Sequence, residues 1–204
     1  MKFRTLLSGV MLWLAGTASA EDVGGQLESR LNAAKTLKAQ FTQVVRADRR
    51  EISRSKGTMA LQRPGKFRWS VAAPMEQLVI ADGENLWIYD IDLEQVTVKK
   101  QGKSIGGTPA LFLSGATQQI TNDFEVSMHA EKDKEYYELR ARSPQENFQK
   151  INMVFRKDSL SRLILHDQLG QVTSIDFRKV QANRPLSEKL FRFVPPRGVD
   201  VVRQ

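Results

Sequence analysis

The sequence predicts a mainly β protein made of a meander of antiparallel strands, with two short helices. From residue 39 onward, apolar and polar residues alternate with a period of two. Pairs of turn-forming residues separate these stretches: Pro64-Gly65, Asp82-Gly83, Asp158-Ser159 and Leu169-Gly170. Counting the stretches gives about eleven strands, and such meanders form β-sandwiches or β-barrels. We find no internal repeat or domain linker, so one domain is expected.

Residues 1–20 have the three parts of a secretory signal peptide. Lys2 and Arg4 supply positive charge, an apolar run follows, and Ala18-Ser19-Ala20 forms a cleavage site. The apolar run is shorter than the ~20 residues of a membrane-spanning helix. We expect a mature domain over 21–204 outside the cytoplasm; the alternative is an uncleaved helix at the membrane interface.

The chain has no cysteine, which excludes a disulfide framework, a thiolate nucleophile and a zinc–thiolate site. A bacterial lipoprotein carries a cysteine directly after its cleavage site, and Glu21 occupies that position here. The mature protein is therefore expected to lack a lipid anchor.

Positive charge is the main compositional bias. The formal net charge is +8, or +6 once residues 1–20 are removed. The basic residues are scattered; the densest group, in an expected loop, is Arg46, Arg49, Arg50, Arg54 and Lys56. With no RNA-binding motif and a signal peptide, a nucleic-acid partner is not expected.

Two segments carry helix signals. Residues 23–38 place apolar side chains three or four residues apart: Val23, Leu27, Leu31, Ala34 and Leu37. In the second segment Thr108 suits a helix N-cap, Pro109 the first helical position and Gly115 the end. Either helix could fill the core of a curved sheet or cover a cavity that opens.

No arrangement of residues predicts catalysis. The two histidines, His129 and His166, lie in expected strands, and adjacent strand residues such as His166 and Asp167 point to opposite faces. No hydrolase, metal-ligating or nucleotide-binding motif is present. We expect no enzyme activity, no metal and no cofactor.

Arg63 precedes the Pro64-Gly65 turn and has two interpretations. The first is a solvated turn residue. The second is a guanidinium that donates to backbone carbonyls at a helix end, because this group has five donors in a rigid fork.

Five short motifs occur in order along the chain. They are Phe41-Thr42-Gln43, Arg63-Pro64-x-x-Phe67-x-Trp69, Asp82-Gly83-x-x-Leu86-Trp87-x-Tyr89, Thr108-Pro109, and Phe191-x-Phe193-x-Pro195-Pro196-x-Gly198-Val199. Through these motifs, residues 21–200 resemble the LolA family of periplasmic outer-membrane lipoprotein carriers. The resemblance implies an incomplete, half-open antiparallel β-barrel of about eleven strands with lid helices over a hydrophobic cavity.

The resemblance also implies the function of a monomeric periplasmic carrier. Such a carrier accepts lipoproteins from an inner-membrane ABC transporter of the LolCDE type, shields their acyl chains, and passes them to an outer-membrane receptor of the LolB type. That receptor shares the fold but is itself a lipoprotein, so Glu21 in place of cysteine favours the carrier. The alternative is a periplasmic lipid-binding or envelope-stress sensor module of the same fold.

Two sets of site residues follow from the resemblance. Arg63 would keep the lid closed by contacting the backbone of Leu31 on the first helix and of Leu113 and Ser114 on the second. Candidates that would line the acyl-chain cavity are Leu27, Phe41, Phe67, Trp69, Leu86, Ile88, Leu111 and Phe112. Trp69 and Trp87 could instead belong to an ordinary core.

Overall fold

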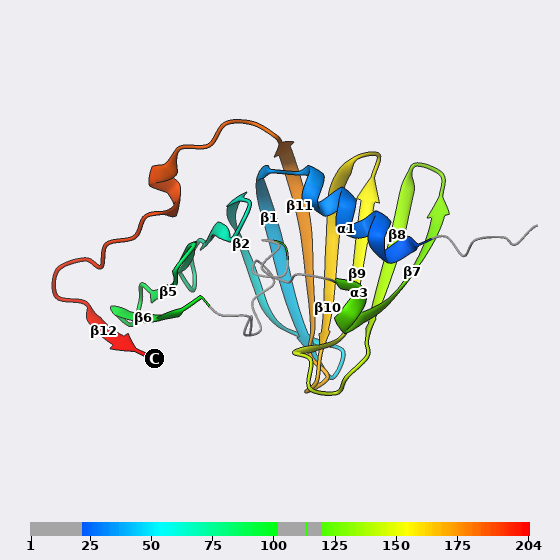
Figure 1. The fold of residues 1–204 in the computed structure, drawn as a ribbon. Coiled ribbons are helices and arrows are strands. Elements are labelled where there is room, and N and C mark those ends of the chain that lie inside the picture. The colour runs from blue at the N-terminus through cyan, green and yellow to red at the C-terminus, as the bar shows by residue number, and fades with distance from the viewer. Residues whose placement is uncertain (1–21, 102–112, 114–119) are drawn as a thin grey trace, which may run out of the picture.

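A single twelve-stranded sheet dominates the computed structural model, which describes residues 22–101, 113 and 120–204 (Figure 1). The strand order is β12-β6-β5-β4-β3-β2-β1-β11-β10-β9-β8-β7. The strands are β1 (Thr36–Ala47), β2 (Arg50–Gln62), β3 (Lys66–Val71), β4 (Gln77–Asp82), β5 (Asn85–Asp90), β6 (Gln95–Lys100), β7 (Phe124–Glu131), β8 (Lys134–Ala141), β9 (Phe148–Arg156), β10 (Ser159–Asp167), β11 (Val172–Ala182) and β12 (Asp200–Arg203).

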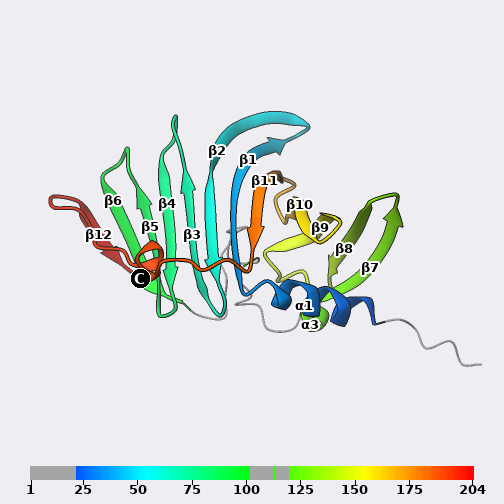
Figure 2. The same cartoon turned by 90° about the horizontal axis from the view of Figure 1, so that it is seen from above.

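The sheet is strongly curved and does not close, because β12 and β7 are its two free edges (Figure 2). Every neighbouring pair is antiparallel except β12 and β6, which are parallel. The predicted mainly β, incomplete barrel is confirmed. The sequence count of about eleven strands missed β12, a short strand that follows the turn at Gly198.

Three short helices are described: α1 (Val23–Ala33), α3 (Ile120–Asp123) and the 3-10 helix η1 (Glu188–Phe191). The predicted helix over 23–38 is wrong at its C-terminal end, because Thr36 and Leu37 already belong to β1. The predicted signal peptide lies outside the described residues, as does the second predicted helix apart from Leu113. No helix among the described residues is long and apolar enough to cross a membrane.

Alternation along the strands gives the sheet two different faces. Phe67, Trp69, Val79 and Leu86 belong to one large buried cluster, on the face that we call the inner face. The Trp69 ring stacks on Phe41 of β1, with ring centroids 3.8 Å apart. In the other half of the sheet, the cluster continues through Leu139, Ile151, Met153, Leu163 and Ile175. α1 contributes Leu27 to this same cluster, so α1 covers the inner face.

The C-terminal segment covers the opposite, outer face of β3–β5. From β11 it runs past η1 to β12 at the far edge of the sheet (Figure 1). Phe193 contacts Trp87 and Tyr89, with ring centroids 5.6 and 5.9 Å apart. Arg68 donates a hydrogen bond to the carbonyl of Leu190. Trp87 thus packs half-buried on the outer face, whereas Trp69 is buried in the core on the inner face.

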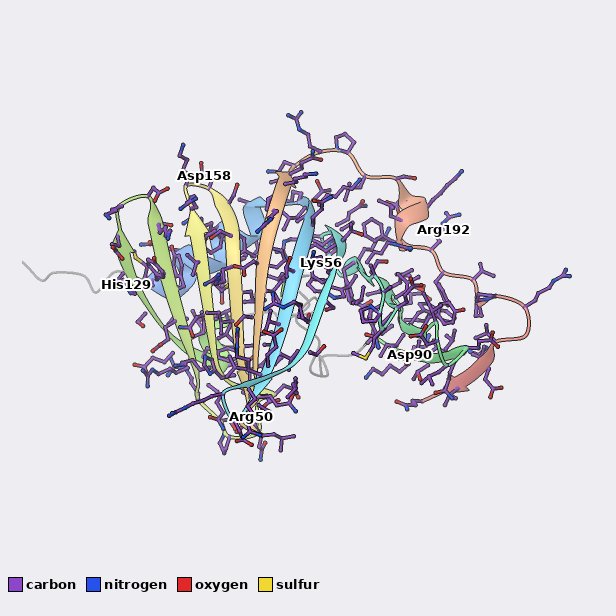
Figure 3. The ribbon with its side chains drawn as sticks, turned by 180° about the vertical axis from the view of Figure 1, so that it is seen from behind. Arg50, Lys56, Asp90, His129, Asp158 and Arg192 are labelled. Carbon is purple, nitrogen blue, oxygen red and sulfur yellow. The ribbon has the colours of Figure 1, made fainter. Side chains whose placement is uncertain are left out.

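The densest basic group is a strand hairpin rather than the expected loop. It lies where β1 and β2 meet, and Arg50 marks its tip, at the opposite end of the sheet from Asp158 (Figure 3). Glu51 pairs with Arg54 at 2.8 Å and with Arg46 at 3.8 Å, which partly neutralises the group.

Candidate functional site

The predicted cavity residues are gathered on the inner face. Leu27, Phe41, Phe67, Trp69 and Leu86 are all buried in the inner cluster, and Ile88 packs against it at partial exposure. Leu113 is also fully buried there, whereas Leu111, Phe112 and Ser114 lie outside the described residues. The structure thus brings the described candidates together into one apolar surface; their contact with acyl chains stays a prediction.

The helix α1 covers part of this apolar surface, and we call it the lid helix. Its side chains Val23, Leu27 and Leu31 recur every four residues and face the inner cluster. Asp22 caps its start by accepting a 2.9 Å hydrogen bond from the NH of Gly25. A helix of 11 residues is only marginally stable alone in water. The lid helix therefore depends on an apolar partner and on polar contacts with the sheet.

Arg63 makes one of these polar contacts. Its Nε donates a 3.1 Å hydrogen bond to the carbonyl oxygen of Ala34, at the C-terminal end of the lid helix. The last carbonyls of a helix lack intrahelical partners and carry partial negative charge, so a cation is favoured there. Burial lowers the pKa of Arg63, and its Nη1 is buried with no hydrogen-bond partner among the described residues. The resemblance implies contacts of Arg63 with Leu31, Leu113 and Ser114. The observed hydrogen bond goes to Ala34, at the same end of the helix as Leu31, and the three expected contacts stay predictions.

Asn183 holds the same end of the lid helix and was not predicted. Its Nδ2 donates to the carbonyl of Ala33 at 3.1 Å, and its Oδ1 accepts from the NH of Lys35 at 2.8 Å. Its own NH donates to the carbonyl of Thr36 at 2.9 Å. These three hydrogen bonds attach the segment between the lid helix and β1 to the residue that follows β11.

The N-terminal part of the lid helix touches α3 closely. The Glu28 carboxylate accepts hydrogen bonds from the NH and the hydroxyl of Thr121 at 3.0 and 3.2 Å. A Cβ added at Gly24 would lie 2.3 Å from the Thr121 methyl, so only glycine permits this approach while residue 121 is threonine.

Arg30 makes a further polar contact between the lid helix and the sheet, and this contact is not predicted from the sequence. It forms an ion pair with Glu135 of β8, in the half of the sheet away from Arg63. Both residues are ordinary charged residues in the sequence, more than a hundred positions apart, so no local pattern pairs them.

The histidines stand apart from the lid. His129 is exposed and stacks on Tyr136, with ring centroids 4.7 Å apart. His166 lies on β10, and burial together with the nearby Lys150 charge lowers its pKa, while Glu138 opposes that shift. Among the described residues, no three His, Asp or Glu side chains are grouped as a metal site would require.

An open, curved sheet whose apolar inner face is covered by a short helix is an incomplete β-barrel with a lid. Sequence comparison identifies the family. The model of the family described as "Outer membrane lipoprotein carrier protein LolA" matches residues 32–194. This chain belongs to the LolA family of outer-membrane lipoprotein carrier proteins.

Relatives match over nearly the whole chain. An outer-membrane lipoprotein carrier protein of Legionella pneumophila (strain Corby) is 52% identical over 178 residues, which cover 87% of this chain and 88% of the relative. One from Nitrosospira multiformis is 37% identical and covers all of both chains. Among solved structures, an uncharacterized conserved protein from Thermus thermophilus is similar in fold, with a TM-score of 0.54 at 14% identity. That likeness covers 88% of this chain and 99% of the other.

Proposed function

We propose that this protein is a periplasmic carrier of lipoproteins. It accepts acylated proteins as an inner-membrane ABC transporter releases them, shields their acyl chains between the lid helix and the inner face, and passes them to an outer-membrane receptor. The observation that carries the proposal is the apolar inner face covered by a helix that only a few polar contacts hold. Membership of the LolA family supports it.

The energetics of acyl chains explain why such a carrier needs a lid. Each buried methylene contributes ~0.8 kcal/mol, so ~25 methylenes give ~20 kcal/mol, close to the ceiling for noncovalent binding. A carrier that bound so tightly could not deliver its cargo. Opening the lid must therefore cost free energy, which cargo binding offsets and cargo release recovers.

The contacts of Arg63 and Leu27 supply part of the free energy that opposes lid opening. Lifting the lid helix breaks the Arg63–Ala34 hydrogen bond, and bonds to charged groups contribute about 1.5–3 kcal/mol each. It also uncovers Leu27, which is fully buried. Acyl chains then replace the sheet as the apolar partner of the lid helix.

A release assay tests the proposal. Inner-membrane vesicles that contain a lipoprotein and its transporter are incubated with ATP and this protein, and soluble lipoprotein is measured. We expect a stoichiometric soluble complex that transfers its lipoprotein to an outer-membrane receptor. A protein that binds acyl chains but releases no lipoprotein from vesicles would instead be a lipid-binding or sensor module of the same fold.

A further inference from the structure

The guanidinium of Arg30 joins the lid helix to strands β8 and β9. Besides its ion pair with Glu135, Arg30 lies 4.2 Å from the centroid of the Phe155 ring on β9. Its Nη2 donates to the carbonyl oxygen of Lys157 in the β9–β10 turn and lies 3.9 Å from the carboxylate of Asp158. A single cation on the lid helix therefore contacts β8, β9 and the turn that follows.

Glu135 lies on the inner face, where a charge is unexpected. On β8 it lies on the same face as Tyr137 and Leu139, which are both buried in the apolar cluster. Its partner on the neighbouring strand β9 is Phe155. The Arg30 guanidinium supplies its counter-charge and lies over the Phe155 ring at the same time. A guanidinium suits this border because it is weakly hydrated and stacks on aromatic faces.

Arg30 and Arg63 hold the same helix to opposite halves of the sheet. Arg63 extends from the β2–β3 turn to the C-terminal end of the lid helix, whereas Arg30 extends from one turn earlier in that helix to β8 and β9. They share no bonding partner among the described residues. Movement of the lid helix away from the inner face must break the Arg30 contacts with β8 and β9.

We propose that Arg30 is a second latch of the lid helix, holding it closed against β8, β9 and the turn that follows. The inference rests on the proposed function, since acyl cargo is what displaces the latch. The apparent affinity for an acyl ligand equals the intrinsic affinity multiplied by the fraction of open protein. A weaker latch therefore gives tighter acyl binding and slower delivery.

Spin labels test the latch without any ligand. The chain has no cysteine, so labels at Ser29→Cys on the lid helix and Arg178→Cys on β11, both exposed positions, report their separation alone. Glu135→Gln keeps the shape of the side chain and removes the charge. We expect Glu135→Gln to add a longer-distance population that the parent protein lacks. Dansylated undecanoic acid should then bind this variant about three- to tenfold more tightly.

The matched control is Asp176→Asn, which breaks an exposed ion pair with Arg162 on the outer face, away from the lid. It should leave both readouts at the parent value. Arg30→Glu alone should open the lid, and adding Glu135→Arg should close it again. If Glu135→Gln leaves the label distances and the probe affinity unchanged, the latch proposal is wrong. If the parent protein fails to bind the probe, the carrier function is in doubt, and the label distances alone decide the latch.

Discussion

The Nε of Arg63 lies 3.1 Å from the carbonyl oxygen of Ala34, so a side chain of the β2–β3 turn caps the lid helix at its C-terminal end. The burial that lowers the pKa of Arg63 also removes water that could replace this bond. The contact is therefore available only when the lid helix lies against the sheet, and we propose that it acts as a latch.

Replacing Arg63 by leucine should weaken closure and leave the apolar surface intact. We expect Arg63→Leu to take up lipoprotein but to transfer it poorly to the receptor, with the closed state destabilised by about 1.5–3 kcal/mol. Transfer from the purified complex is the measurement. Arg68→Leu is the matched control. Arg68 is also partly buried and donates to a backbone carbonyl, but it lies on the outer face, away from the lid helix. Normal transfer by Arg63→Leu would refute its role as a latch.

The attachment at Asn183 should depend on both its backbone and its side chain. Its φ of 55° is in the left-handed region, which glycine adopts freely and alanine does not. We expect Asn183→Gly to lose the side-chain bonds to Ala33 and Lys35, costing about 1–3 kcal/mol, and Asn183→Ala to lose about 1 kcal/mol more. Urea denaturation measures both. Equal stability of the glycine variant and the parent would mean that these bonds contribute nothing.

Gly57 should be intolerant of any side chain. It faces Phe41 across β1 and β2, and an added Cβ would lie 2.1 Å from the carbonyl of Ser70 and 2.5 Å from the Phe41 ring. Because Phe41 stacks on Trp69, the clash would spread into the inner cluster. We expect Gly57→Ala to destabilise the fold by about 1–3 kcal/mol in urea denaturation, whereas the exposed neighbour Thr58→Ala changes stability by less than ~0.5 kcal/mol. A Gly57→Ala variant as stable as the parent would contradict the observed contact.

His166 should make stability fall as the pH is lowered. Its pKa in the folded protein lies below the ordinary 6.5, chiefly because burial disfavours its charged form. Between the folded and unfolded pKa values the unfolded chain binds more protons, so acid favours unfolding in that window. The parent should lose more stability between pH 8 and pH 5.5 than His166→Gln does, measured by urea denaturation. An identical pH dependence in the two proteins would rule out this contribution.

Much of the fold could be predicted because it depends on local patterns. Alternation placed Phe67 and Trp69 on one face, and turn pairs marked the hairpins. Leu37 was assigned to the helix because it continues the stripe after Ala34, but it equally begins the alternation with Ala39 and Phe41 in β1. Where a residue fits both the helical and the strand period, tertiary packing decides which element it joins.

The lid contacts show what local patterns cannot supply. A motif and the turn beside it single out Arg63, but the hydrogen bond to Ala34 is not among the contacts that the resemblance implies. Arg30, Glu135 and Asn183 carry no local signal, because each acts on a segment more than a hundred residues away. The packing around Phe193 on the outer face depends in the same way on a distant C-terminal segment.

We expect acyl cargo to enter only when the lid helix separates from α3 and the inner face. A Cβ at Gly24 would lie 3.6 Å from the Cβ of Thr121, within the ~3.5–4.5 Å that a disulfide requires. The Gly24→Cys, Thr121→Cys double variant therefore tethers the lid helix to α3 in a chain that otherwise has no cysteine. In the vesicle release assay, we expect the oxidised variant to take up no lipoprotein and the reduced variant to take it up, with both single-cysteine variants unaffected by oxidant. Equal uptake by the oxidised and reduced double variant would contradict the account.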